Sequence, residues 1–209
     1  MVRVKICGIT NAADALAAID AGANLLGFNF YERSPRHIDE AEAAKIRRQL
    51  PKKIEAVGIF VNAPPADVAN VCKSLRLDAA QLHGDESPQT VAEIARSHTV
   101  WKAFRVEPDF RLETLDEYPG ASAFLFDAAH TGQYGGTGRT TDWDVARRAA
   151  VGHRIILAGG LNVENVAAAV RIVRPYAVDV ASGVESKPGK KDHGRMLEFV
   201  QEVRRGERK

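Results

Sequence analysis

Two residues far apart in the sequence carry side chains that can transfer protons. The stretch 2–10 is predicted to form a short buried strand that ends at Cys7, and Asp127 ends the apolar stretch 123–127. At neutral pH about 3% of a free thiol is thiolate and about 0.1% of a free aspartate is protonated. Burial and neighbouring charges must therefore tune either group before it acts as a general acid or a general base. The sequence leaves open which group gives the proton and which takes it.

Two glycine-bearing turns late in the chain predict an anion site. Gly159 and Gly160 follow one apolar stretch, and Ser182 and Gly183 follow the next. Backbone N–H groups without a neighbouring Cβ, together with a helix N-terminus, can bind phosphate without any lysine. We therefore predict phosphate binding at both turns. The alternative is that these glycines only permit tight turns.

Three further features complete the set of candidates. Arg36 suits a planar carboxylate, because its guanidinium matches two oxygens at once, although it can equally be an ordinary surface arginine. His83 could join Cys7 and Asp127 at a zinc ion, but no HxH or CxxC spacing supports this, and we predict no metal. The glycine-rich loop 132–139 is interpreted as a lid, with an ordinary surface loop as the alternative.

Apolar stretches alternate with helical patterns along the whole chain. Helix starts are predicted at Asn11, Asp39, Pro65 and Ser87, a weak helix at 110–118, and further helices at 143–150, 163–173 and 195–204. Strands are predicted at 2–10, 25–30, 56–61, 78–83, 100–105, 123–127, 155–158 and 177–181. We therefore predict an α/β fold, a single closed (β/α)₈ TIM barrel over residues 1–209 with a short or degenerate fifth helix. An open doubly wound sheet would have fewer strands and a glycine fingerprint after the first one.

A barrel of this type fixes where chemistry can occur. Its active site forms at the carboxyl ends of the strands, so the polar residues that follow the strands share one mouth. Besides the two glycine turns, these residues are Cys7, Asn29, Arg36, Asn62, His83, Arg105 and Asp127.

Composition excludes several classes of protein. The chain has 209 residues, 45% of them hydrophobic, and a formal net charge of +2, so neither a nucleic-acid nor a membrane partner is expected. No membrane span or signal peptide is recognisable, and Cys7 and Cys72 lie in unlike contexts. Cys72 has the spacing of a buried helix residue, which favours a reducing, cytoplasmic location over a disulfide framework. The basic segment 203–209 is predicted to be a solvated, fraying end.

The residues closely resemble one family, the phosphoribosylanthranilate isomerases of tryptophan biosynthesis, which are (β/α)₈ enzymes. The resemblance covers nearly the whole chain in order, and one departure is Thr140-Thr141-Asp142-Trp143, where the family more usually has phenylalanine before Asp-Trp. The matching stretches are VKICGIT (4–10), GFNF (27–30), SPR (34–36), GIFVN (58–62), QLHG (81–84), FD (126–127), GGTG (135–138), LAGGL (157–161), SGVE (182–185), PG (188–189) and KD (191–192).

The resemblance implies an Amadori rearrangement of N-(5′-phosphoribosyl)anthranilate to 1-(2-carboxyphenylamino)-1-deoxyribulose 5-phosphate. Asp127 would be the general acid, Cys7 the general base, and Arg36 the partner of the anthranilate carboxylate. His83 would contact the substrate, and the backbone around Gly136, together with Gly159, Gly160, Ser182 and Gly183, would bind its phosphate. The resemblance implies no metal or organic cofactor, and the chain is expected to be a monomer or a homodimer.

Three alternatives remain open at this point. A related phosphoribosyl isomerase of histidine biosynthesis would be expected to carry Asp in place of Cys7. A metal-dependent aldolase or lyase would lose activity with a chelator. A non-catalytic phosphosugar-binding barrel would bind phosphate without turnover.

Overall fold

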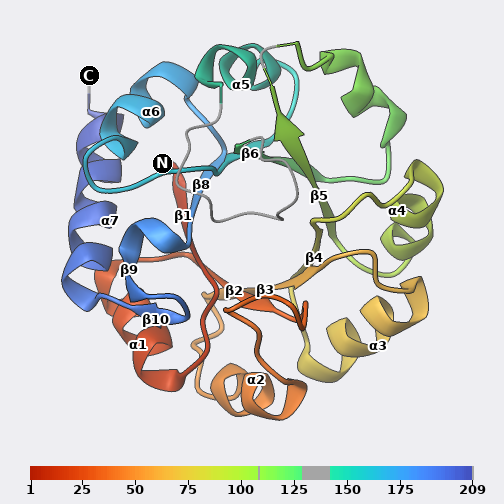
Figure 1. The fold of residues 1–209 in the computed structure, drawn as a ribbon, viewed down its shortest axis with the longest axis horizontal. Coiled ribbons are helices and arrows are strands. Elements are labelled where there is room, and N and C mark those ends of the chain that lie inside the picture. Colours follow the sequence, from red (N-terminus) through yellow and green to blue (C-terminus); the bar gives the residue numbers. More distant parts are fainter. Residues whose placement is uncertain (108, 129–141, 209) are drawn as a thin grey trace.

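The computed structural model describes residues 1–107, 109–128 and 142–208, and its centre is a closed barrel of eight parallel strands in sequence order (Figure 1). The predicted (β/α)₈ barrel is confirmed. Most strands begin and end within one residue of the predicted positions, whereas the first is shorter than predicted. The strands are β1 (Arg3–Cys7), β2 (Leu25–Asn29), β3 (Glu55–Phe60), β4 (Ala79–Leu82), β5 (Val100–Val106), β6 (Ala123–Ala128), β7 (Ile155–Leu157) and β8 (Ala177–Val180).

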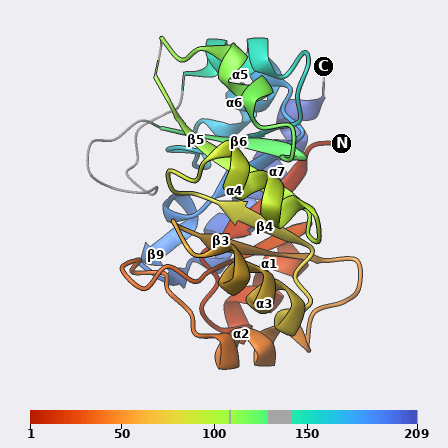
Figure 2. The same cartoon turned by 90° about the vertical axis from the view of Figure 1, so that its right-hand side faces the viewer.

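Helices surround the barrel, as the view along its axis in Figure 1 and the side view in Figure 2 show. The element after β5 is a short 3₁₀ helix, η1 (Leu112–Glu117), which confirms the predicted degenerate fifth helix. The α-helices are α1 (Ala12–Ala21), α2 (Glu40–Arg47), α3 (Pro65–Leu75), α4 (Pro88–Ala95), α5 (Trp143–Ala149), α6 (Val166–Val173) and α7 (His193–Glu207). Within the part of the chain that the structure describes, no helix is long and apolar enough to cross a membrane.

Helix starts follow from capping residues. The side chains of Asn11, Asp39 and Ser87 accept hydrogen bonds from the backbone three residues further on, as predicted from their types. After β8 the chain forms the short helical turn η2 (Ser182–Val184). The hairpin of β9 (Glu185–Lys187) with β10 (Lys190–Lys191) follows, and the sequence does not anticipate it.

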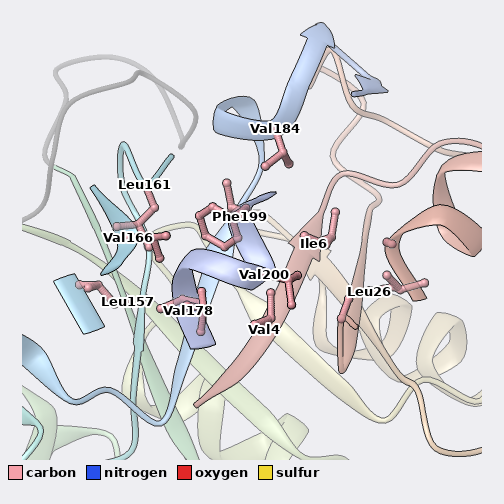
Figure 3. Packing of buried hydrophobic residues seen from close by; sticks show 14 of the residues in the cluster. Val4, Ile6, Leu26, Leu157, Leu161, Val166, Val178, Val184, Phe199 and Val200 are labelled. Carbon is pink, nitrogen blue, oxygen red and sulfur yellow. The ribbon is translucent and has the colours of Figure 1, made fainter. Parts of the chain in front are cut away.

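Alternation along the strands separates two cores. Val4 and Ile6 of β1 belong to the outer core between barrel and helices, where Val4 lies beside Val200 of α7 (Figure 3). The intervening residue, Lys5, hydrogen-bonds across the barrel to β4, so it faces the interior. The inner core is apolar toward the amino ends of the strands; it contains Leu25, Val57, Trp101, Leu125 and Ile156.

The prediction for the basic segment 203–209 is wrong up to Glu207. The apolar stripe of α7 continues through Val203, which is fully buried, and Gly206 is buried as well. The Arg204 guanidinium donates to the backbone carbonyl of Val2, so the two ends of the described chain are joined. Packing of an amphipathic face outweighs the basic composition of this segment.

Gly206 provides a test of this packing. A Cβ at this position would lie 2.7 Å from the Ala167 carbonyl oxygen and 3.0 Å from Cβ of Val170. Alanine normally stabilises a helix by about 1 kcal/mol relative to glycine. We nevertheless expect Gly206→Ala to lower the free energy of unfolding by about 1–3 kcal/mol, because of overpacking, in urea denaturation.

The matched control is Gly152→Ala, since a Cβ at Gly152 meets no atom within 4 Å. This variant should leave the free energy of unfolding unchanged or raise it by up to about 1 kcal/mol. An equal response of both variants would show that α7 does not pack closely at Gly206.

Candidate functional site

An open cavity lies at the carboxyl ends of the strands, where the active site of a (β/α)₈ barrel forms. Most of the predicted site residues line it, although they come from opposite ends of the sequence. Gly183 lies next to a lining residue, while Gly136 and the predicted lid 132–139 lie outside the described residues. The lining includes Cys7, Asn29, Arg36, Gln81, His83, Asp127, Gly159, Gly160, Asp179 and Ser182.

Two residues predicted at the mouth do not line this cavity. The Asn62 side chain accepts from the backbone N–H of Asp85, and Arg105 Nη2 donates to the Asp85 carboxylate at 2.6 Å. Asn62 also adopts a left-handed backbone, with φ of 53°. Both residues therefore order the loop that follows β4, and their polar character reflects loop structure.

The two glycine turns require glycine for different reasons. Gly159 and Gly160 have φ of 79° and 63°, so they do permit a tight turn. Gly183 has another constraint, because a Cβ there would lie 2.0 Å from the carbonyl oxygen of Leu161. Within the described residues, the backbone N–H groups of Gly159, Gly160, Ser182 and Gly183 donate to no acceptor. These N–H groups are available to an anion.

A fully buried charge lies beneath the cavity. Lys5 is 0% exposed, and its ammonium donates at 2.9 Å to the carboxylate of Asp179 on β8 and at 2.9 Å to Oε1 of Gln81 on β4. Burial opposes the charged form, but the charges of Asp179 and the Cys7 thiolate outweigh it and raise the pKa of Lys5. Lys5 and Asp179 thus form a buried ion pair below the cavity floor.

Cys7 lies two residues after Lys5 on the same face of β1. Withdrawal from water raises the pKa of the Cys7 thiol, and Asp179 adds to this effect, while the charges of Lys5 and Lys191 act in the opposite direction. Cys7 is therefore a thiol at rest, next to two cations that favour the thiolate. Cys72, by contrast, is buried on α3 as predicted, and burial alone raises its pKa to about 12.

Asp127 is held between its own backbone and a histidine. Its Oδ1 accepts from the Ala128 N–H at 2.8 Å, and Oδ2 lies 3.3 Å from Nε2 of His83, without the alignment of a hydrogen bond. The other ring nitrogen, Nδ1, lies 2.9 Å from Nε2 of Gln81. Among the described residues, no three His, Cys, Asp or Glu side chains gather as a metal site would require.

Arg36 is anchored by a residue of the β9–β10 hairpin. Its Nε and Nη2 donate to the two carboxylate oxygens of Glu185 at 2.8 and 2.7 Å, and Lys191 Nζ donates to the same carboxylate at 2.8 Å. Gly8 allows this arrangement, since a Cβ there would lie 2.6 Å from Cδ of Arg36. Two cations share one carboxylate, so the cluster retains a net positive charge at the cavity wall.

Comparison with known proteins identifies the family. The chain matches the family described as N-(5'phosphoribosyl)anthranilate (PRA) isomerase over residues 4–202. It is 52% identical over 200 residues to the N-(5'-phosphoribosyl)anthranilate isomerase of Pelobacter propionicus, and the alignment covers 96% of this chain and 94% of that protein. The chain belongs to the phosphoribosylanthranilate isomerase family. It is therefore an isomerase of tryptophan biosynthesis.

Solved structures of phosphoribosylanthranilate isomerases share this fold. The structure from Thermotoga maritima is 40% identical, with a TM-score of 0.91, and covers 98% of this chain and 99% of its own. Another structure of the family, at 40% identity, a TM-score of 0.87 and the same coverage, is a complex with reduced 1-(o-carboxyphenylamino)-1-deoxyribulose 5-phosphate.

Three polar residues in or near the cavity of this isomerase are not identified by the sequence analysis: Lys5, Asp179 and Glu185. Lys5 and Asp179 each stand between apolar neighbours in a strand, which in a closed barrel indicates a side chain facing the interior. This alternation of polar and apolar residues could have predicted that both side chains face the barrel interior. Glu185 offers no comparable local signal, because its partner Arg36 lies 149 positions away.

The Glu185 cluster predicts a pH dependence of stability. Burial acts to raise the pKa of Glu185, but Arg36 and Lys191 outweigh it and hold the pKa below its ordinary value of 4.5. A depressed folded-state pKa contributes stability that is present above the unfolded-state pKa and is lost as the pH falls through the folded-state pKa. We expect Glu185→Gln to destabilise the protein most at neutral pH, and the difference from wild type to shrink as the pH falls below 4.5.

Urea unfolding at a series of pH values measures this difference. The exposed Glu198 on α7 supplies the control, because Glu198→Gln removes a carboxylate without touching the cluster. A pH-independent effect of Glu185→Gln would mean that ionisation of Glu185 contributes nothing to stability.

Proposed function

We propose that this chain catalyses the Amadori rearrangement of N-(5′-phosphoribosyl)anthranilate, with Asp127 as general acid and Cys7 as general base. The observation that carries the proposal is that both residues, from β6 and β1, line one cavity of a chain in this family. The same cavity has a guanidinium at one wall, and the backbone N–H groups at the turns after β7 and β8 have no acceptor among the residues that the structure describes. A single domain, residues 1–209, would carry the whole reaction.

The reaction needs two proton transfers at the sugar. Asp127 gives a proton to the furanose ring oxygen, and the bond between C1′ and that oxygen breaks while the lone pair of the anthranilate nitrogen forms a C1′=N iminium bond. Cys7, as thiolate, takes the proton from C2′, and the electron pair of that C–H bond forms the enolamine, which then tautomerises to the ketose. Lys5 and Lys191 favour the thiolate and so oppose part of the effect of burial on the Cys7 thiol. Side chains account for both transfers, so the proposal requires no metal or organic cofactor.

Arg36 would bind the anthranilate carboxylate. Glu185 occupies the Nε and Nη2 side of the guanidinium, which leaves the Nη1 side as a second edge for a carboxylate. The net positive charge of the Arg36, Glu185 and Lys191 cluster favours an anion at this wall. The phosphate would lie on the N–H groups of Gly160 and Gly183, with Gly136 as a further proposed contact.

The direct test is an isomerase assay on freshly prepared N-(5′-phosphoribosyl)anthranilate, with and without EDTA. We expect turnover that EDTA leaves unchanged. Loss of activity with the chelator would point to a metal-dependent reaction, and phosphate binding without turnover would point to a non-catalytic phosphosugar-binding barrel. Both cysteines are free thiols, which suits the reducing cytoplasm that we propose as its location.

Substitution of the proton-transfer groups tests their roles. A general acid or base contributes roughly 10²–10⁴ to the rate. We expect Cys7→Ala and Asp127→Asn each to lower kcat by at least about 10² while the far-ultraviolet circular dichroism spectrum stays that of the folded protein. Cys72→Ala removes the other thiol and should keep its kcat. Full activity in either site variant would overturn that residue's assignment.

Arg36→Met separates binding from chemistry. A charge-assisted hydrogen bond is worth about 1.5–3 kcal/mol, so its loss should raise KM roughly 10- to 150-fold with a smaller change in kcat. Arg36→Lys keeps the positive charge but loses the planar guanidinium that can donate two parallel hydrogen bonds. Its KM should lie between those of wild type and Arg36→Met. Steady-state kinetics measures both constants, and an unchanged KM in Arg36→Met would remove Arg36 from the binding site.

A further inference from the structure

A row of side chains crosses the barrel interior from β1 to β6. Lys5 donates to Oε1 of Gln81, and Nε2 of Gln81 meets Nδ1 of His83 at 2.9 Å. Nε2 of His83 in turn lies 3.3 Å from Oδ2 of Asp127. Lys5 and Gln81 are buried, and the Nε2 atom of His83 is shielded from solvent, so water does not compete for these groups.

The buried lysine decides how the Gln81 amide is oriented. A lysine ammonium has three donors and no acceptor, so the atom of Gln81 beside it must be the oxygen. A rotated amide would place two donors 2.9 Å apart in a dry interior. The NH₂ group of Gln81 therefore faces His83, and its orientation follows from chemistry rather than from the shape of the side chain.

The oriented amide then decides which nitrogen of His83 carries the proton. Because Gln81 donates, Nδ1 of His83 must accept, and an accepting Nδ1 places the ring proton on Nε2. That Nε2–H faces Asp127, and within the described residues it has no other acceptor. A buried N–H without an acceptor costs about 1–3 kcal/mol, so an oxygen of Asp127 that moves into alignment with Nε2–H gains a hydrogen bond.

We propose that Gln81, held by Lys5, is a positioning residue that fixes the Nε2–H tautomer of His83, so that His83 stabilises the carboxylate left on Asp127 after proton donation. The proposal rests on Asp127 being the general acid of the proposed function. The negative charge on Asp127 develops during the reaction, and a donor already aimed at it lowers the transition state more than the ground state. The contact of 3.3 Å is one that shortens as this charge forms.

The opposite tautomer shows what the row of side chains prevents. With the proton on Nδ1, His83 would present a donor to the NH₂ group of Gln81 and a lone pair to Asp127. The lone pair would repel the carboxylate that proton donation produces, which would slow that step. The interior of the barrel thus selects the tautomer before any substrate arrives.

The ring nitrogens of His83 can be observed directly by ¹⁵N nuclear magnetic resonance of the free protein. We expect a protonated Nε2 and an unprotonated Nδ1 in wild type, with the signals assigned by their loss in His83→Gln. In Gln81→Glu the new carboxylate accepts from the ring, so Nδ1 should become protonated. A protonated Nδ1 in wild type, or an unprotonated Nδ1 in a folded Gln81→Glu, would overturn the proposal.

Kinetics tests the consequence for Asp127. Gln81→Met leaves the tautomer of His83 unfixed, and we expect kcat to fall roughly ten- to hundredfold, the usual effect of losing an orienting partner, with KM nearly unchanged. His83→Gln places an amide N–H near the position of Nε2 and should retain more activity than His83→Leu. Gln89→Met, at an exposed position of α4, is the matched control and should behave as wild type.

The two readouts separate this inference from the proposed function. An inactive wild-type protein whose His83 carries its proton on Nε2 would contradict the proposed reaction while leaving the tautomer assignment standing. An active Gln81→Met with wild-type kcat would contradict the positioning role while leaving the reaction standing. If Gln81→Glu does not fold, the wild-type spectrum and Gln81→Met still decide the outcome.

Discussion

The pairing of β1 with β8 closes the barrel, and the candidate site depends on this closure. The register aligns Lys5 with Asp179, so the strand contact and the buried ion pair form together. The same closure brings the loop of Arg36 to Glu185. It also lets Asp14 of α1 accept from the Lys191 backbone. Without the closure, neither the cavity nor the charges around it would exist.

The barrel divides its interior between stability and chemistry. Toward the amino ends of the strands, Leu25, Trp101 and Leu125 fill it with apolar side chains. Toward the carboxyl ends, buried charges replace them, and each costs solvation energy that its partner must offset. Two buried ion pairs offset this cost: Lys5 with Asp179, and Lys191 with Glu185. The polar layer is therefore the part of the core where function, more than packing, dictates residue type.

Local patterns predicted most of the fold but fewer of the contacts inside it. Apolar stretches, capping residues such as Asn11 and the weak segment before Tyr118 were sufficient for the eight strands and the reduced fifth helix. The prediction of a fraying end is wrong for α7, because burial of the apolar stripe ending at Val203 outweighs the basic composition of this segment. The inward direction of Lys5 was overlooked because alternation with charge suits an exposed strand equally well until closure is considered.

The contact between Arg36 and Glu185 could not be predicted from the sequence, for a different reason. Partners separated by 149 positions leave no periodicity between them, and only the folded barrel places Glu185 beside the guanidinium. The same holds for the row from Lys5 to Asp127, in which each strand contributes one or two polar residues of unremarkable type. Sequence could therefore predict several residues of the mouth, such as Cys7 and Asp127, but not Asp179, and the bonds among them exist only in the folded barrel.

Closure by the two ends of the chain also affects how the protein is made. A ribosome adds about 5–20 residues per second, so β1 emerges roughly ten seconds or more before Val180 completes β8. Throughout that interval the nascent chain presents an unpaired strand edge, and the ammonium of Lys5 has no carboxylate from β8. Co-translational collapse must leave this seam open, and the ion pair of Lys5 with Asp179 forms only after β8 has been synthesised.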